Sequence, residues 1–581
     1  MRFGTIGIKQ EMLKKWELRE KNNSTLSALE KYNPLILRLL SNRGVVTQKE
    51  IEDFFGFEYL VSENLLGIAG MKKAVERIVL ARERQEKIAI FGDYDADGVT
   101  ATALLFEALE NLGFDNLTYY IPDRQLEGYG MNDSAVEFLK NEGVELIITV
   151  DSGITNISEV EKAKVLGMDV IITDHHHVPA ILPEAFAIIN PHLENSGFEF
   201  ADLAGVGVAF KLAQGLYQKM APEKIDQLKW MLDLVAIGTV ADCVVLLGEN
   251  RMLVKYGLVV LSKTRRVGLL EMFKVGRIDI SENSIPDTQK IAYQIAPRIN
   301  ATGRMDHAGI SYKLIMEKEQ VQARMLALEV EERNQERQKM TSEIVKEIEI
   351  LAERDFSDKK FIYVSNEHWP VGILGLVAGK IVDKFKKPAV VFQKQEKEYV
   401  GSFRSIPEVN IIELLGKCAD LLSRFGGHSQ AAGVRILPEN VPQFCVKMAE
   451  LIEAELGEKE LVSSLMIDLE LKAQEVNWEF LTDLKKMEPF GMGNKEPIFL
   501  LRGMRIVDVR MVGNGTKHLK LALRATDGNP KIFDAIGFKL GEEFSGLRKD
   551  DLIDVAFNLA EDEWNGSKKI QLKLIDIRIA E

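Results

Sequence analysis

The sequence has few of the residues and segments that mark secreted or membrane proteins. Its 581 residues include three cysteines, Cys243, Cys418 and Cys445, which lie far apart and are odd in number. We therefore expect neither a disulfide framework nor a cysteine-based zinc site. No apolar run reaches the roughly 18–20 residues that a membrane-spanning helix needs, and residues 1–16 lack the apolar core of a signal peptide. These absences predict a cytoplasmic protein with no membrane partner.

The chain also lacks an excess of positive charge. Lys and Arg number 74 against 88 Asp and Glu, which gives a net charge of −14. Because nucleic-acid-binding proteins are usually basic, this balance argues mildly against a nucleic-acid partner. Net charge is a sum over the whole surface, however, so a basic groove can lie on an acidic body. A site built of carboxylates also adds negative charge of its own.

Strand and helix patterns divide the chain into several regions, as its length suggests. Between residues 71 and 307, buried strand patterns alternate with amphipathic helical patterns, which predicts a doubly wound α/β domain with a parallel sheet. Residues 1–70 have short helical patterns, and we expect them to form a helical segment packed on that domain. Residues 308–355 form one long helical pattern. Its middle, EERNQERQK (331–339), has no apolar residue, which is typical of a linker helix surrounded by solvent.

Two further domains are expected after this linker helix. Residues 356–458 alternate strands and helices again, which predicts a second α/β domain. Residues 459–581 contain five or more alternating strand patterns separated by turns, as in a small β-barrel.

Three buried strand patterns of the first α/β domain end in polar residues. KIAIFG is followed by Asp93, Asp95 and Asp97, and LIITV by Asp151. VIIT is followed by three of the eight histidines of the chain, in DHHH (174–177). Because the carboxyl ends of parallel strands meet at one edge of a sheet, we expect these side chains to gather there. Bare carboxylates would repel one another, whereas a mixed carboxylate and imidazole set suits Mn²⁺, or Mg²⁺.

Each of these pieces also has an ordinary structural explanation. A single aspartate after a strand is most often a helix N-cap or a turn residue. The stretch DYDADG alone fits a calcium-type loop, and a histidine run on a loop is often solvated. Three separate strand ends with metal-binding groups favour the metal site.

The motifs of the chain resemble those of the DHH phosphoesterase superfamily. Four of them stand in the order of that superfamily: GDYDADG (92–98), VDSG (150–153), TDHH (173–176) and GTVAD (238–242). Further motifs resemble its RecJ branch: NPLILRLLSNRG (33–44), PRINATGR (297–304), GSFRSI (401–406), FGGHSQAAG (425–433) and PFGMGN (489–494). The resemblance implies a DHH catalytic domain over 71–307, a DHHA1 substrate-binding domain over 356–458 and an OB-type nucleic-acid-binding domain over 459–581.

The resemblance also implies an activity. Members of this branch are 5′→3′ exonucleases that hydrolyse single-stranded DNA in repair and recombination, by two-metal activation of water. The implied cofactors are two divalent cations, with Mn²⁺ preferred over Mg²⁺. The implied partners are single-stranded DNA with a 5′ end, a single-stranded-DNA-binding protein and a helicase, and we expect a monomer.

The metal ligands and catalytic residues are carried over from the superfamily motifs. Asp174 is expected to orient a neighbouring histidine, while His176 lies at the scissile phosphate or the second ion. Asp93 is either a ligand or a loop residue, and His177 is expected to be solvated or structural. Phe91 stands where related enzymes often have a histidine, which leaves the first ion with a thinner ligand shell. The implied metal ligands are Asp95, Asp97, Asp151 as the bridge between the ions, His175 and Asp242.

The implied substrate contacts lie in the RecJ-type motifs. Arg404 and Ser402 are expected to bind a phosphate, the one at the 5′ end, because the guanidinium fork suits bidentate phosphate contact. Gly427 and His428 would approach the DNA with backbone and imidazole. The usual alternative for a lone arginine is a surface salt bridge. Motif context outweighs that alternative for Arg304 and Arg404 but not for Arg124. Further contacts are expected from Arg298, Asn300, Arg304 and Arg124.

Single-strand specificity would follow from a narrow cleft between the two α/β domains, with the barrel as a stacking and electrostatic platform. Alternatively, the barrel is a packing domain whose aromatic residues are core: Phe533, Phe538, Phe557 and Trp564.

Two other functions fit parts of the pattern. A nanoRNase or cyclic-dinucleotide phosphodiesterase of the same superfamily shares the chemistry, but such proteins are shorter and lack the extra terminal segments. A catalytically inactive DNA-binding replication scaffold shares the fold, but such relatives have lost metal ligands that this chain retains.

Overall fold

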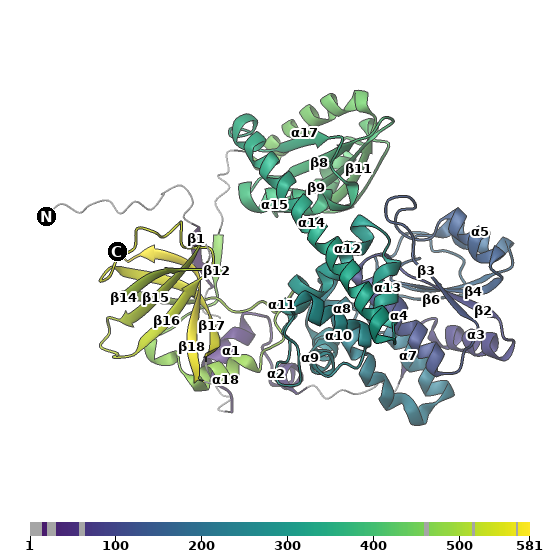
Figure 1. Ribbon diagram of the computed structural model, residues 1–581, viewed down its shortest axis with the longest axis horizontal. Helices are drawn as coiled ribbons and strands as arrows, with labels where there is room; N and C mark the ends of the chain where they lie inside the picture. Colours follow the sequence, from purple (N-terminus) through teal and green to yellow (C-terminus); the bar gives the residue numbers. More distant parts are fainter. Residues whose placement is uncertain are drawn as a thin grey trace. The chain divides into compact units, whose positions relative to one another are not determined.

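The computed structural model describes residues 14–19, 31–56, 64–457, 464–513, 517–564 and 567–580. The chain divides into two compact units, one formed by Tyr59–Leu461 and the other by Met1–Glu58 together with Val462–Glu581 (Figure 1). None of the helices in these described ranges combines the length and the apolar character needed to span a membrane.

The first domain of the larger unit is built on a five-stranded sheet in the order β3-β2-β4-β5-β6. Every pairing in it is parallel, as the sequence predicts. Its central strands carry almost unbroken runs of buried Ile, Val and Ala because helices cover both faces. The strands are β2 (Lys87–Phe91), β3 (Leu117–Tyr120), β4 (Val144–Val150), β5 (Asp169–Thr173) and β6 (Ala187–Ile189).

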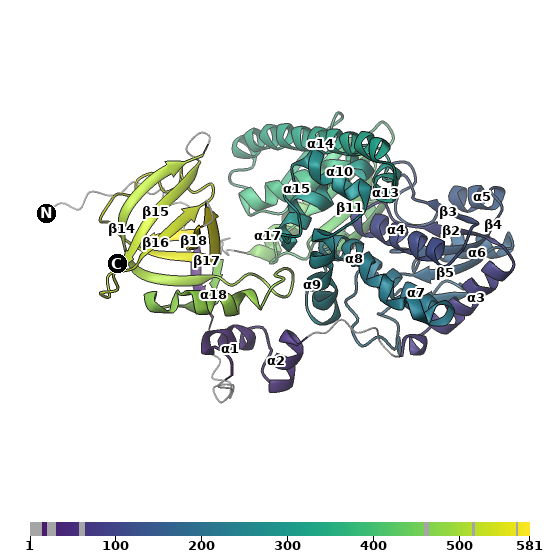
Figure 2. The same cartoon turned by 60° about the horizontal axis from the view of Figure 1, so that its bottom comes forward.

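Helices pack on both faces of this sheet (Figure 2). One face holds α5 (Asp133–Asn141) and α6 (Ile157–Val165). The other face holds α3 (Met71–Glu83), α4 (Ala96–Asn111) and α7 (Gly205–Met220). A helical layer follows, made of α8 (Leu232–Ala241), α9 (Gly248–Ser262), α10 (Val267–Gly276), α11 (Thr288–Lys290), a π-helical turn (Ile291–Ile295), α12 (Ala296–Met305) and α13 (Gly309–Met316). This is the expected doubly wound domain.

The linker differs in two ways from the expectation of one solvated helix over residues 308–355. It consists of α13 and a separate 36-residue helix, α14 (Gln320–Asp355), with an interruption at residues 317–319. Its polar middle is covered on one side, because Asn334 is 1% exposed and Thr341 is 2% exposed. A sequence pattern shows that a residue is polar, but packing decides whether water reaches it.

The second α/β domain contains a mixed five-stranded sheet in the order β10-β11-β9-β8-β7. Its core includes Ile344 and Ile348 of α14, so the linker helix belongs to this domain's packing as well. The strands are β7 (Ile362–Asn366), β8 (Ala389–Lys394), β9 (Tyr399–Arg404), β10 (Arg424–His428) and β11 (Ala431–Ile436); the helices are α15 (Val371–Phe385), α16 (Ile411–Gly416) and α17 (Val441–Leu456).

The C-terminal domain is a closed five-stranded barrel, as predicted. Its strands run β14-β15-β16-β18-β17, and β17 pairs back with β14 to close the sheet. The strands are β14 (Phe499–Val512), β15 (His518–Ala525), β16 (Ile532–Gly537), β17 (Leu552–Trp564) and β18 (Ser567–Ile579), preceded by β12 (Ser464–Ile467), β13 (Leu469–Glu470) and α18 (Trp478–Lys485).

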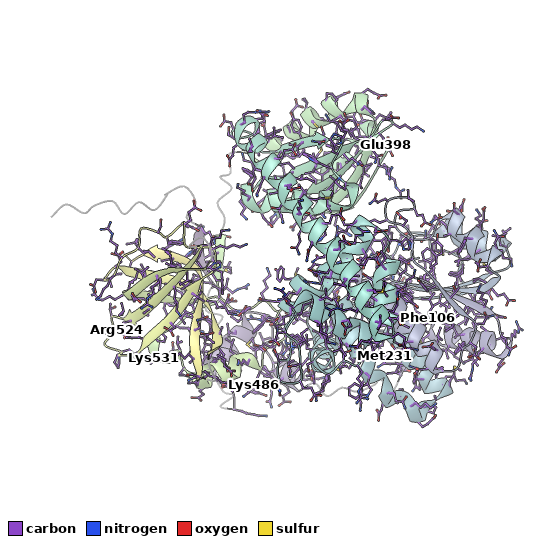
Figure 3. All side chains as sticks on the ribbon, viewed as in Figure 1. Phe106, Met231, Glu398, Lys486, Arg524 and Lys531 are labelled. Atoms are coloured by element: carbon purple, nitrogen blue, oxygen red, sulfur yellow. The ribbon has the colours of Figure 1, made fainter. Side chains whose placement is uncertain are left out.

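The barrel aromatics have different environments. Phe533 and Phe557 are core residues, with 1% and 0% exposure, whereas Phe538 is 59% exposed and packs edge-on against His518. The side chain of Trp564 lies outside the described residues. Exposed basic residues of this domain include Lys486 and Arg524 (Figure 3).

The expectation that residues 1–70 pack on the first α/β domain is wrong for most of this segment. Up to residue 58 it belongs to the same unit as the barrel. There, strand β1 (Lys15–Leu18) pairs in parallel with β12, and Trp16 donates a hydrogen bond to Asp576. Two short helices follow, α1 (Pro34–Ser41) and α2 (Gln48–Phe55), while the turn Leu65–Gly67 packs on α3 and α7 as expected. The parts of residues 1–70 at 1–13, 20–30 and 57–63 lie outside the described residues.

Candidate active site

The polar ends of β2, β4 and β5 meet at one edge of the first domain. These strands are neighbours in the sheet, so the loops that follow them lie side by side. Asp95 is the N-cap of α4, and its side chain accepts hydrogen bonds from the backbone N–H groups of Asp97 and Gly98. Asp151 follows β4 with a positive φ of 58°, a conformation uncommon outside glycine. A fourth group, Asp242, comes from the C-terminal end of α8.

Three overlapping sets of these side chains place one ligand atom each within 4.8 Å of one another. The residues predicted from the sequence as metal ligands therefore come together, and Asp93 joins them. The sets are Asp93 with Asp95 and Asp151; Asp97 with His175 and Asp242; and Asp151 with His175 and His176.

Both oxygens of the Asp97 carboxylate are held by the start of α7. They accept hydrogen bonds from the backbone N–H groups of Gly205 (2.7 Å) and Val206 (3.0 Å). These N–H groups have no partner within their own helix, and the helix dipole favours an anion at that position. Packing is too tight there for a side chain, since a Cβ on Gly205 would lie 2.4 Å from Asp151 Oδ1.

His175 is arranged as a ligand to a cation. Burial, and then the neighbouring His176, lowers the pKa of His175 to about 4, so the ring is neutral at pH 7. The ring hydrogen-bonds to the backbone of Leu203, which leaves the lone pair on Nε2. Nε2, an acceptor in this state, lies close to two other acceptors, 3.1 Å from Asp151 Oδ1 and 3.5 Å from Asp242 Oδ2. Acceptors this close to one another are favourable only with a cation between them.

His176 has a different environment, dominated by Asp174. Its Nδ1 lies 2.7 Å from Asp174 Oδ1 and 3.0 Å from the hydroxyl of Tyr129. Burial opposes a charge on the ring, but the hydrogen bond to Asp174 and the surrounding carboxylates raise the pKa of His176 to about 9. Burial alone would raise the pKa of Asp174, but hydrogen bonds from His176 and from backbone N–H groups hold it below its ordinary value. The pair is therefore a positioned imidazolium and carboxylate, consistent with the orienting role expected for Asp174.

The remaining carboxylates are raised in pKa by burial and by mutual repulsion. Burial first, and then the charge of Asp95, raises the pKa of Asp97 to about 7. Burial, together with Asp97 and Asp95, raises the pKa of Asp242 to about 9. The pKa values of Asp93 and Asp151 are shifted well upward for the same reasons. Such a cluster is unfavourable as a set of bare anions and is stabilised when divalent cations are bound.

The donor set fits two ions of the Mn²⁺ or Mg²⁺ type. Asp93 Oδ1 and His175 Nε2 are buried and have no hydrogen-bond partner among the described residues. Oxygen ligands with one or two imidazoles suit Mn²⁺, and Mg²⁺ prefers the oxygens. Phe91 has no part in this shell, because it is fully buried and stacks on Tyr120 at 5.2 Å. His177 is exposed, as expected.

An arginine cluster lies beside the carboxylates. Burial, followed by the positive charges of Arg124 and Arg337, lowers the pKa of Arg304 to about 9. Arg404 also lowers this pKa, whereas Asp95 raises it. Arg124 stacks on the ring of Tyr94 at 4.7 Å, and Arg404 donates to Ser402 Oγ at 3.3 Å. Among the residues that the structure describes, none of Arg124, Arg304 and Arg404 forms an ion pair; Arg304 donates to the carbonyl oxygen of Gly372. Unpaired, mutually repelling guanidinium groups are the environment that a phosphate anion favours.

The other predicted substrate residues lie in different environments. His428 and Arg404 both pair with Ala431 of β11, so they lie in one row across the sheet. Gly427 has a φ of 144° on the exposed edge strand β10, where a Cβ would lie 2.3 Å from the carbonyl oxygen of Ala431. Arg298 is occupied elsewhere, because it pairs with Glu331 of α14 at 2.6 Å and donates to two backbone carbonyls.

Three residues near the site were not assigned these positions from the sequence. Asn300 was expected to contact substrate, but its side-chain oxygen accepts a hydrogen bond from the backbone N–H of Ala96 in the aspartate loop. Tyr129, which contacts His176 and the carbonyl of Asp151, lies in the same EGYG stretch that follows Arg124. Tyr94 supports Arg124 from within DYDADG. No local sequence pattern shows that these three side chains have these contacts.

The fold and the site define a metal-dependent phosphoesterase of the DHH class. The DHH family N-terminal domain model matches residues 87–239, the DHHA1 domain model residues 358–454 and the RecJ OB domain model residues 467–576. The chain belongs to the RecJ family. It is 37% identical to the single-stranded-DNA-specific exonuclease RecJ of Bacillus subtilis, over 98% of this chain and 71% of that protein. It is 31% identical to RecJ of Escherichia coli, over 94% of this chain and 96% of that protein.

Solved structures agree with this assignment. The structure of RecJ from Thermus thermophilus in complex with Mn²⁺ matches with a TM-score of 0.80 and 27% identity, over 98% of this chain and 80% of that chain. The Mg²⁺ complex of the same protein matches with a TM-score of 0.75. The expected ions are thus the ones that a structural relative binds.

Proposed function

We propose that this protein is a metal-dependent exonuclease that hydrolyses the phosphodiester bonds of single-stranded DNA from the 5′ end. The observation that carries the proposal is the gathering of buried, self-repelling carboxylates beside arginines that repel one another and form no ion pair among the described residues. The first set requires cations and the second requires an anion. Divalent cations satisfy the first set, and a phosphodiester bound to those cations and to the arginines satisfies the second; the RecJ relatives are named for cleavage of single-stranded DNA.

The metal ligands in this proposal are Asp95, Asp97, Asp151, His175 and Asp242, with Asp93 as a further ligand. Asp151 and His175 each belong to two of the three ligand sets, and of the two only the Asp151 carboxylate has a second oxygen with which to bridge two ions. Two such ions, when bound, lower the pKa of a water molecule and stabilise the charge that develops on the phosphate oxygens.

The protein side chains orient the substrate and hold protons. His176 is fixed through Nδ1 by Asp174, and in its protonated form its Nε2–H donates a hydrogen bond to an oxygen of the scissile phosphate. Arg304 and Arg124 neutralise that phosphate from the other side. Asn300 acts indirectly, by holding the loop that carries Asp95 and Asp97.

The 5′ polarity rests on the phosphate site of the second domain. Arg404 and Ser402 bind the terminal 5′ phosphate, with Gly427 and His428 at the neighbouring strand edge. A strand anchored there by its 5′ end presents the first internucleotide bond to the metal site. The barrel contributes the exposed ring of Phe538 as a base-stacking surface, in keeping with OB-type domains.

The proposal includes a cellular role. A 5′→3′ single-strand nuclease of this type serves DNA repair and recombination in the cytoplasm, where a helicase supplies the strand and a single-stranded-DNA-binding protein covers it. We propose a monomer as the working unit; one chain supplies both the proposed metal ligands and the arginine cluster.

A degradation assay tests the proposal. The substrates are 5′-labelled and 3′-labelled single strands, a matched duplex and a dinucleotide, each with Mn²⁺ and with Mg²⁺. We expect immediate release of the 5′ label from single strands and no attack on the duplex, and we expect Asp151→Ala to abolish cleavage while DNA binding remains. Cleavage of the dinucleotide alone would indicate a nanoRNase, and binding without cleavage by the unmodified protein would indicate a scaffold.

A further inference from the structure

The loop between β3 and α5 reaches the candidate active site with two side chains. Arg124 belongs to the arginine cluster, and its charge acts on Arg304. The hydroxyl of Tyr129 lies 3.0 Å from His176 Nδ1. Residues 121–132, which form this loop, contain no helix or strand. Contacts other than those of a regular element must therefore hold the two side chains in place.

Glu127 ties this loop to the elements on either side of it. Its Oε1 accepts hydrogen bonds from the hydroxyl of Tyr120 at 2.7 Å and from Asn132 Nδ2 at 2.9 Å. Its Oε2 accepts from the backbone N–H of Asp123 at 2.6 Å. Tyr120 is the last residue of β3 and Asn132 is the N-cap of α5. One carboxylate therefore joins both ends of the loop.

Both ends are themselves held by the rest of the domain. The ring of Tyr120 stacks at 5.2 Å on Phe91, which is fully buried. The side-chain oxygen of Asn132 caps α5 by accepting from the N–H of Ala135, so its amide nitrogen is left to face Glu127. Burial, and then the hydrogen bond to Glu127, raises the pKa of Tyr120 above its ordinary value, which keeps the hydroxyl a donor.

Asp123 extends the effect of Glu127 to the backbone of Arg124. Its carbonyl oxygen accepts from the N–H groups of Glu127 at 2.9 Å and Gly128 at 3.1 Å. Its side-chain Oδ1 accepts from the N–H of Gln125 at 2.8 Å. Arg124 lies between these bonded residues in the chain, so its backbone cannot shift without breaking the bonds.

The position of Tyr129 depends on the same support. It has a glycine on each side, with φ angles of 86° and 79°. Glycines permit this sharp turn but do little to restrict the backbone. Asn156, in the loop after β4, forms two hydrogen bonds with the backbone of Met131. The segment around Tyr129 is thus fixed by Glu127 before it and by Asn156 after it.

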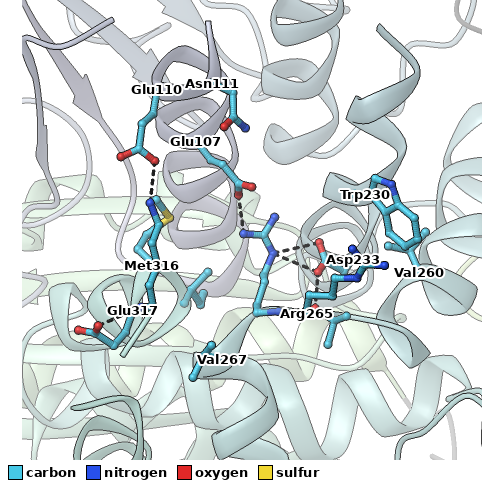
Figure 4. A pocket seen from close by; sticks show the side chains of 14 residues that line it. Glu107, Glu110, Asn111, Trp230, Asp233, Val260, Arg265, Val267, Met316 and Glu317 are labelled. Atoms are coloured by element: carbon cyan, nitrogen blue, oxygen red, sulfur yellow. Dashed lines mark hydrogen bonds and ion pairs between the residues drawn. The ribbon is translucent and has the colours of Figure 1, made fainter. Parts of the chain in front are cut away.

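Other carboxylates of the first domain pair with cations. Beside a cavity of about 320 Å³ between α4, α10 and the end of α13, Arg266 pairs with Glu107 and Asp233 (Figure 4). Such ion pairs join one helix to another. Within the described part of the chain, Glu127 forms no ion pair, and its hydrogen bonds go to the loop and to the two anchors of the loop.

We propose that Glu127 is a positioning residue for the exonuclease reaction, which holds Arg124 at the substrate phosphate and Tyr129 at His176. The inference rests on the proposed single-strand exonuclease function and concerns a residue outside the proposed metal ligands and DNA contacts. Arg124 is partly exposed and Tyr129 is 42% exposed, so DNA can reach the part of the loop that Glu127 fixes. A shift of about 1 Å in such a part can cost roughly a hundredfold in rate.

The first test measures DNA binding. In an Asp151→Ala background, which prevents cleavage, the affinity for a 5′-phosphorylated single strand is followed by fluorescence anisotropy over a series of salt concentrations. We expect Glu127→Ala to weaken binding about tenfold and to reduce the salt slope by about one, as for a lost phosphate contact. In an Arg124→Gln background, Glu127→Ala should cause no further loss, because the contact that Glu127 supports is already absent.

The second test measures the chemical step by single-turnover cleavage at saturating DNA and Mn²⁺. We expect Glu127→Ala to lower the rate about tenfold or more. In a protein that carries both Arg124→Gln and Tyr129→Phe, the same change should cost less than about twofold. The Mn²⁺ concentration for half-maximal activity should not change, because no proposed metal ligand lies on this loop.

The matched control is Glu137→Ala on α5. Glu137 is exposed and pairs with Lys162 at 2.7 Å, so its loss should leave the affinity, the rate and the melting temperature unchanged. Glu127→Gln keeps the size of the side chain and one acceptor oxygen. We expect it to show intermediate losses in both tests, and it replaces Glu127→Ala if that variant does not fold.

Equal losses with and without Arg124 and Tyr129, or a raised Mn²⁺ requirement, would overturn the inference, because Glu127 would then act on the fold or on the metal site as a whole. That result would leave the proposed function standing, because the unmodified protein still degrades single strands. Failure of the unmodified protein to cleave any single strand would instead remove the proposed function itself.

Discussion

The side-chain oxygen of Asn300 lies 2.8 Å from the backbone nitrogen of Ala96 and accepts its hydrogen bond. Ala96 stands between Asp95 and Asp97, so helix α12 positions the loop that carries these two proposed metal ligands. The two residues are 204 positions apart in the chain. The PRINATGR motif therefore acts on the metal site through the backbone, in addition to any contact that Arg304 makes with DNA.

Replacement of Asn300 by Ala should weaken metal binding more than catalysis. Loss of residues that orient metal ligands typically lowers metal affinity about 10–100-fold. We expect the Mn²⁺ concentration for half-maximal activity to rise by about tenfold, with most of kcat recovered at saturating Mn²⁺. Metal titration of the nuclease rate measures both quantities. Gln294→Ala, at an exposed position one helical element earlier, serves as the control and should leave the titration unchanged.

Gly238 in the GTVAD motif should tolerate no side chain. An added Cβ would lie 2.5 Å from Asp97 Oδ1 and 2.5 Å from Thr100 Oγ1, so Gly238→Ala must displace Asp97, a proposed metal ligand, or Thr100. We expect activity to fall by about a hundredfold or more, as for a misplaced catalytic group. The matched change is Gly379→Ala in α15, where an added Cβ meets nothing within 4 Å. That control should keep full activity and gain about 0.5–1 kcal/mol of stability; similar activities of the two variants would refute the explanation.

Removal of metal should make stability strongly dependent on pH. In the folded protein the pKa of Asp97 is about 7 and that of Asp242 about 9, both raised from 3.8. The folded state then binds more protons than the unfolded state above about pH 4, so metal-free stability falls as pH rises through 7 and towards 9. We expect the melting temperature in chelator to drop from about pH 6 to about pH 9, and saturating Mn²⁺ to abolish most of the drop.

The source of that pH dependence can be checked in the protein itself. Asp242→Asn removes the group with the higher pKa, so its melting temperature in chelator should vary less with pH between about 7 and 9. An unchanged slope in this variant would mean that other groups titrate in that range.

Arg43 should be needed for the stability of the unit that contains the barrel. Its guanidinium donates to the carbonyl of Leu39, to Asn494 Oδ1 and to the carbonyl of Lys495, which joins α1 to the PFGMGN loop. Arg43→Ala leaves these acceptors unpaired, and we expect a loss of about 1–3 kcal/mol in the unfolding of this unit. Chemical denaturation followed by tryptophan fluorescence measures it. Lys49→Ala, at an exposed position on α2, should change the free energy of unfolding by less than about 0.5 kcal/mol.

The gathering of the proposed metal ligands was predictable because its determinants are local. The apolar runs of β2, β4 and β5 show where each strand ends, and the parallel sheet brings those ends together. Asp95, Asp97, Asp151 and His175 follow these strands directly, so knowledge of the strands was enough to place them. Asp242 required the resemblance to a known family, because it ends a helix that lies far along the chain.

The closed barrel was predictable for a similar reason. Alternating residues along β14 to β18 give each strand one apolar side, and five such strands close on a shared core. The sequence alone did not distinguish Phe533 and Phe557, which fill that core, from Phe538, which is exposed.

Only the tertiary structure decided which distant segments meet. The pairing of β1 with β12 joins positions about 450 residues apart, and no periodicity within either segment specifies its partner. Asn300 became a support for the aspartate loop, and Arg298 a partner of Glu331, through the packing of α12. The middle of α14 has the composition of a solvated helix, yet Asn334 and Thr341 are buried. Composition determines what a side chain can bond to, whereas burial and the identity of its partner depend on the rest of the chain that folds around it.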